Sequence, residues 1–147
     1  MSELIVISFD DKFKADEVML SLLKLERDYL IDLEDAVVIT KNSAGKIRIK
    51  PYYDLIADDG LSDNFWGKLI AAIAIDPQPE TLAKIGIDQK FCQEFDRAMP
   101  LRSSAIFILV RNAEPHQVLE ELGKFQGKVL QTSLSKENKA QIQQALS

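Results

Sequence analysis

Two short apolar runs, residues 4–9 and 105–110, have the composition of buried strands. Each has six residues and is rich in Ile, Leu, Val and Phe. Continuous apolar runs of this length and composition are typical of strands that are covered on both faces. Residues 36–40 and 128–134 contain further strand-like segments. The pattern therefore predicts two central strands and two flanking ones.

Each central run is followed by apolar residues at helical spacing. Val18, Leu22, Leu25 and Tyr29 lie at positions i, i+4, i+7 and i+11, which predicts a helix over residues 16–30 with one apolar stripe. Positions 18, 19, 22 and 25 match positions 118, 119, 122 and 125 at a constant offset of 100, which predicts a second helix after Pro115. The chain therefore contains two strand–helix–strand units.

Two such units predict an α+β fold, a ferredoxin-like split βαβ repeat with an antiparallel sheet. We expect the strand order 128–134, 4–9, 105–110, 36–40 and 46–50, since the most apolar strands belong in the middle. Residues 46–50 alternate basic and apolar side chains, which is typical of a protected sheet edge. Gly45 supplies the left-handed residue of the hairpin turn before them.

The segment between the repeats has a helical pattern. Ser62 is a candidate cap for a helix over residues 61–75 that Pro77 stops, and Pro79 begins a short helix that Gly86 ends. Asp88 is a candidate cap for a third helix. We expect a single domain over residues 1–147: a first unit with its edge strand (1–51), a helical insertion (52–100) and a second unit with a C-terminal helix (101–147).

Composition excludes several classes of protein. The 147 residues include one cysteine and one histidine, which excludes a disulfide framework and a His-rich metal site. The net charge of −5 argues against nucleic acid as a partner, because DNA and RNA attract basic surfaces. The start of the chain lacks the pattern of a signal peptide, and the longest apolar run, residues 69–75, is too short for a membrane span. We expect a soluble, cytoplasmic protein.

Several ordered segments carry a resemblance to a known family. They are residues 2–6, 15–18, 31–38, 85–88, 103–107, 118–122 and 130–135. In these segments the chain resembles the bacterial proteins grouped as domain of unknown function 1269, which are described as membrane proteins. That family carries a long Gly/Ala-rich apolar hairpin after a Trp-Gly pair, whereas Trp66-Gly67 is followed here only by residues 68–75. The resemblance implies no known activity and no catalytic residues.

Three groups of residues are candidates for chemistry, and each also has an ordinary structural role. Asp10 and Asp11, with Asp35 or Asp59, offer the oxygen ligands that Ca²⁺ and Mg²⁺ prefer, but they also suit turns and caps. Cys92 lies on the apolar face of its helix, so we expect a buried, unreactive thiol. His116 follows Pro115, and we expect it to lie at the surface. We therefore predict no catalytic, cofactor-binding or metal site, no cofactor and no enzyme activity.

The helix over residues 61–75 is apolar around much of its circumference, so one covering surface does not hide it. We expect one side to pack on the sheet and the other to contact a second copy of the chain, as a homodimer or a larger homo-oligomer. The residues assigned to this interface are Phe65, Trp66, Leu69, Ile70 and Ile73. The favoured function is a non-enzymatic interaction or regulatory module; the alternatives are a small-molecule-binding domain and a peripheral membrane-associated protein.

Overall fold

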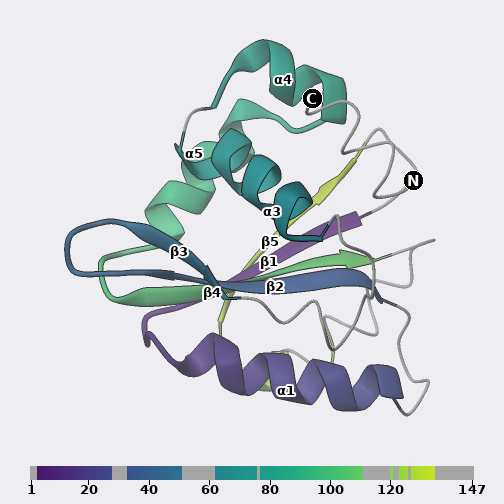
Figure 1. The fold of residues 1–147 in the computed structure, drawn as a ribbon, viewed down its shortest axis with the longest axis vertical. Coiled ribbons are helices and arrows are strands. Elements are labelled where there is room, and N and C mark those ends of the chain that lie inside the picture. The colour runs from purple at the N-terminus through teal and green to yellow at the C-terminus, as the bar shows by residue number, and fades with distance from the viewer. Residues whose placement is uncertain are drawn as a thin grey trace.

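The fold is a five-stranded antiparallel sheet with helices on both faces (Figure 1). The computed structural model describes residues 3–27, 33–50, 62–75, 77–110, 120, 123–125 and 127–134. The strands are β1 (Glu3–Phe9), β2 (Leu33–Lys41), β3 (Ile47–Lys50), β4 (Ser103–Val110) and β5 (Lys128–Ser133). The helices are α1 (Lys14–Arg27), α3 (Ser62–Ile70), α4 (Pro79–Ile85) and α5 (Gln89–Ala98), with a π-helical turn η1 (Ala71–Ile75) and a 3₁₀ turn η2 (Gly123–Phe125).

The strand order is β3-β2-β4-β1-β5, so the order predicted from the repeat is confirmed. β1 and β4 pair at the centre, where Ile5 lies opposite Ile108 and Ile7 opposite Ile106. Ile7 and Ile108 are both 0% exposed, as expected for central strands. Within each unit the two strands are parallel, and one strand of the other unit lies between them. The ferredoxin-like assignment also needs the helix after Pro115, most of which lies outside the described residues.

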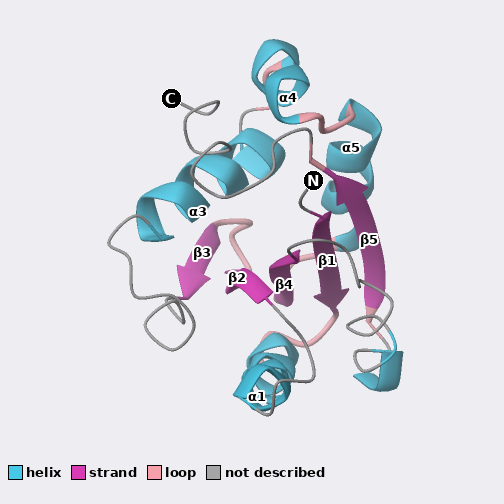
Figure 2. Cartoon of the chain, turned by 90° about the vertical axis from the view of Figure 1, so that its right-hand side faces the viewer, coloured by secondary structure: helices cyan, strands magenta, loops and turns pink. Residues whose placement is uncertain are grey.

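The core is divided into two layers because side chains alternate across the sheet. One layer lies under α1 and includes Ile5, Ile7, Ile106 and Ile108, while the other lies under α3, η1, α4 and α5 and includes Phe107. Figure 2 shows α1 on one side of the sheet and the helical insertion on the other. The expectation that one side of the helix over residues 61–75 packs on the sheet is confirmed.

Trp66 is part of the core of the single chain, although the sequence assigned it to an interface between copies. Its ring packs edge-to-face on Phe107, with centroids 6.2 Å apart, and Phe95 packs on the same ring at 5.3 Å. Trp66 and three other residues assigned to the interface, Leu69, Ile70 and Ile73, are at most 1% exposed. They are covered because α4, α5 and the sheet surround the helix on several sides. The side chain of Phe65 lies outside the described residues, and the association of copies stays a prediction.

The ends of several elements lie where capping and turn chemistry predicted them. Asp88 is the N-cap of α5, and its carboxylate accepts a hydrogen bond from the Lys90 backbone nitrogen at 2.8 Å. Pro79 opens α4, and Gly86 ends it in the left-handed conformation at φ 83°. Gly45 adopts φ 81° in the β2–β3 turn. The helix over residues 61–75 is confirmed as α3 continued by η1, although the π-helical turn was not expected.

Candidate functional site

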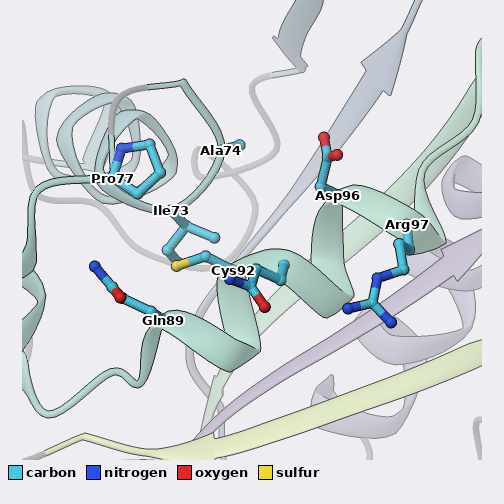
Figure 3. A pocket seen from close by; sticks show the side chains of 8 residues that line it. Ile73, Ala74, Pro77, Gln89, Cys92, Asp96 and Arg97 are labelled. Carbon is cyan, nitrogen blue, oxygen red and sulfur yellow. The ribbon is translucent and has the colours of Figure 1, made fainter.

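A groove of about 460 Å³ lies between η1 and α5 within the helical insertion (Figure 3). Both elements belong to the segment that the sequence marked as an insertion between the repeats. The groove has an apolar wall, a polar wall and a cysteine between them. Its lining residues are Ile73, Ala74, Pro77, Gln89, Cys92, Gln93, Asp96 and Arg97.

The polar wall is the outward face of α5. This helix buries Phe91, Phe95 and Ala98 against the rest of the insertion and the sheet. The opposite face is exposed and carries Gln89, Gln93 and Arg97 at intervals of four residues. Residues four apart in a helix lie above one another, so the three side chains follow the groove along its length. The rise of about 1.5 Å per residue separates the first from the last by about 12 Å.

The apolar wall is formed by η1 and by Pro77 after it. In a π-helical turn the hydrogen bonds run from residue i to i+5, which is rare and frequently marks a functional site. Ile73 is buried beneath the groove, Ala74 is half-buried, and Ile75 beyond them is 66% exposed. The apolar wall therefore has Ile73 as its floor, with the half-buried Ala74 and the exposed Pro77 nearer the surface.

Cys92 lies between the two walls, and Figure 3 shows its sulfur directed toward Ile73. Burial raises the pKa of the Cys92 thiol because desolvation disfavours the thiolate, and the nearby negative charge of Asp88 acts in the same direction. A hydrogen bond with the backbone opposes these effects only in part. The thiol is therefore neutral at physiological pH and acts as a small apolar group, as the sequence predicted.

Of the two charged residues that line the groove, one has an oppositely charged neighbour among the described residues and the other does not. Lys41, at the end of β2, reaches across to α5, where its Nζ donates to the Met99 carbonyl at 3.1 Å and lies 4.0 Å from a carboxylate oxygen of Asp96. Asp96 thus has a cationic neighbour, although its side chain is 80% exposed. For Arg97, no carboxylate of the described residues lies within ion-pair distance. The groove therefore ends beside a guanidinium that is open to a ligand.

The other candidate residues from the sequence do not join this groove. Asp10 and Asp11 are exposed in the β1–α1 turn, and Asp11 Oδ1 accepts a hydrogen bond from the Phe13 backbone nitrogen at 2.7 Å, as in an Asx turn. The side chain of Asp35, together with Asp59 and His116, lies outside what the structure describes. Within the described part of the chain, no three His, Cys, Asp or Glu residues form a group that could hold a metal ion.

Signals for the groove itself are weak in the sequence. Gln89, Gln93 and Arg97 are spaced four residues apart, but polar residues have this spacing on any solvated helix face, so the spacing alone does not indicate a groove. Only the packing of η1 beside α5 makes it one wall of a groove. Cys92 was singled out as a buried residue, and that environment is confirmed.

Comparison with known proteins gives one match. A family model described as "Protein of unknown function (DUF1269)" matches residues 60–147, more than half of the chain, which include the groove and the second repeat. No curated protein and no solved structure matches the chain. In the described ranges, no helix is both long and apolar enough to cross a lipid bilayer.

Proposed function

The chain belongs to the DUF1269 family of proteins of unknown function, and we propose that it is a non-enzymatic module that binds a small organic molecule in the η1–α5 groove. The groove carries this proposal. Its volume of about 460 Å³ is in the range of known ligand sites, roughly 300–1,000 Å³. Such sites combine an apolar lining with a few polar groups that orient the ligand. Ile73, Ala74 and Pro77 supply the apolar part, and the outer face of α5 supplies the polar part.

The environment of Cys92 supports binding over catalysis. A nucleophilic cysteine reacts as the thiolate and needs a lowered pKa or an adjacent base. In this groove the pKa of the Cys92 thiol is raised by burial, and Asp88 adds to the effect. The groups around it are apolar side chains, two amides and one exposed ion of each sign. This set can hold and orient a molecule, and it lacks an activated nucleophile.

Native mass spectrometry of the gently purified protein tests the proposal. We expect a retained small molecule on the wild-type chain. Ala74→Trp fills the groove and should remove the extra mass. The matched control is Ala83→Trp, which places the same bulk on an exposed position of α4 outside the groove lining and should keep the extra mass. A bare wild-type chain, or equal loss of the molecule in both variants, would contradict binding in the groove.

Self-association is the second candidate function, and a difference between the two sheet edges favours it. β3 carries Arg48 and Lys50, and like charges on two facing copies repel each other. β5 ends the other edge of the sheet with one charged residue, Lys128, and Val129 on it is 42% exposed. An edge strand without such protection is a template for pairing with another chain. A homo-oligomer would therefore form at β5.

A further inference from the structure

We infer that the ligand of the η1–α5 groove is a small aliphatic carboxylate: an apolar chain of a few carbons ending in one carboxylate group. The inference rests on the proposed function, since it names the chemistry of a ligand for the same groove. It is carried by the lining of the groove, which combines an apolar wall and a neutral thiol with a guanidinium that has no carboxylate of the described residues within ion-pair distance. The apolar surface suits the chain, and Arg97 suits the charged end.

The apolar wall is suited to a saturated chain and offers little to a charged group. Ile73, Ala74 and Pro77 present only carbon to the groove from their side chains, and the neutral Cys92 thiol continues that surface. Burying the chain of a ligand here removes apolar area from water, which stabilises binding at roughly 25 cal/mol per Å². The amides of Gln89 and Gln93 line the groove on the α5 side, opposite η1.

Arg97 determines the charge of the ligand. A guanidinium presents a planar fork of donors that matches a carboxylate in a bidentate pair. No described carboxylate is within ion-pair distance of Arg97. The neighbouring acid, Asp96, already lies 4.0 Å from the Lys41 ammonium. A cationic ligand would compete with Lys41 for Asp96, whereas an anionic ligand meets an available guanidinium.

Three probes with the same chain and different ends separate these effects: hexanoate, 1-hexanol and hexylammonium. Each is titrated into the ¹⁵N-labelled protein, and the backbone amide shifts of residues 73–74 and 89–97 are followed. We expect hexanoate to bind about tenfold more tightly than 1-hexanol, because it adds a charge-assisted hydrogen-bonded pair. Hexylammonium should bind no more tightly than 1-hexanol.

Two variants assign the preference to Arg97. Arg97→Gln should reduce the affinity for hexanoate to that for 1-hexanol and leave 1-hexanol unchanged. Lys90→Gln removes the same charge from an exposed position of the same helix that does not line the groove, and it should keep the tenfold preference. Asp96→Asn should increase the affinity for hexanoate, since it removes a negative charge beside the bound carboxylate.

The outcomes distinguish failure of this inference from failure of the proposed function. If 1-hexanol shifts the groove amides and hexanoate binds no more tightly, the groove binds apolar molecules and the carboxylate assignment is overturned. Equal effects of Arg97→Gln and Lys90→Gln would also overturn it, because the preference would then come from overall charge. If none of the three probes shifts residues 73–74 or 89–97, both the ligand class and binding in the groove are contradicted.

Discussion

The hydroxyl of Ser104 lies 3.2 Å from the backbone nitrogen of Ala15 and accepts its hydrogen bond, although 89 residues separate them. The same hydroxyl donates to the Asp11 carbonyl at 2.6 Å. Ser104 is the second residue of β4, the first strand of the second repeat, and Ala15 lies in the first turn of α1, where backbone N–H groups lack partners within the helix. One buried side chain therefore caps the helix of the first repeat from a strand of the second.

Replacing Ser104 by alanine should destabilise the fold by about 1–3 kcal/mol, because the Ala15 N–H remains buried without its acceptor. Urea unfolding followed by circular dichroism measures the change. Ser43→Ala is the control, since Ser43 is exposed in the β2–β3 turn and should change the free energy of unfolding little. Equal stability of Ser104→Ala and wild type would show that the cross-repeat cap contributes nothing.

The central strand pair should be the most sensitive part of the core. Ile7→Ala or Ile108→Ala removes a fully buried side chain and should cost about 2–5 kcal/mol through lost burial and the cavity left behind. Val129→Ala, at the partly exposed edge strand, should cost much less. Chemical denaturation of the three variants checks this order, and an equal cost at all three positions would contradict the central placement of β1 and β4.

Two glycines should respond in opposite directions to the same substitution. A Cβ at Gly127 would lie 2.5 Å from Phe9 Cε1 and also press on Ile7 Cγ2, so Gly127→Ala should destabilise by about 1–3 kcal/mol. A Cβ at Gly67 in α3 meets nothing within 4 Å, so Gly67→Ala should stabilise by about 0.5–1 kcal/mol through helix propensity. Thermal unfolding of the pair tests the contrast; a stabilising Gly127→Ala would show that β5 does not lie tightly on β1.

The raised pKa of the Cys92 thiol makes a prediction about pH. Because folding raises this pKa, the neutral thiol favours the folded state below the ordinary pKa of a free thiol, and that contribution is lost as the pH rises through the folded value. Iodoacetamide should label the native protein slowly at pH 7.5 and rapidly after unfolding in urea. Cys92→Ala should remove part of the alkaline loss of stability. Rapid labelling of the native protein at neutral pH would contradict the buried, neutral thiol.

Self-association through β5 predicts a dimer that one edge substitution disrupts. Val129→Lys places a charge on the exposed edge and should shift the protein to a monomer without changing its circular dichroism spectrum. Arg48→Glu at the opposite edge, on β3, is the comparison: Arg48 is exposed, the edge stays charged, and the dimer should remain intact. Sedimentation at tens of micromolar gives the masses, and a monomeric wild-type chain would rule out this candidate function.

Much of the fold was predictable because it rests on local signals and on a repeat. The apolar runs at 4–9 and 105–110 identified the central strands, and the offset between the repeats led to the observed strand order. Asp88, Pro79 and Gly86 marked helix ends because capping depends on a few neighbouring residues. The packing environment of Trp66 was not predictable from such local signals. A helix that is apolar around its circumference must be covered on several sides. Which surfaces cover it depends on long-range packing. Here residues of the same chain pack around Trp66.

The candidate site was less predictable than the fold. The residues of the polar wall follow the pattern of an ordinary solvated helix face. The residues of the apolar wall follow the pattern of a buried helix end. Nothing local distinguishes η1 from a continued α-helix, since alanine and isoleucine occur readily in both. The groove exists because η1 packs beside α5, and that contact joins residues from separate helices.

Intermolecular nuclear Overhauser effects between bound hexanoate and assigned methyl groups test the central claim most directly. The methyls of Ile73 and Ala74 lie in the groove, while those of Val129 and Leu101 are exposed elsewhere on the surface. Binding in the η1–α5 groove predicts cross-peaks from the aliphatic chain to Ile73 and Ala74, and their loss in Ala74→Trp. Cross-peaks only to Val129 or Leu101 would contradict the account, because the molecule would then adhere to exposed apolar side chains outside the groove.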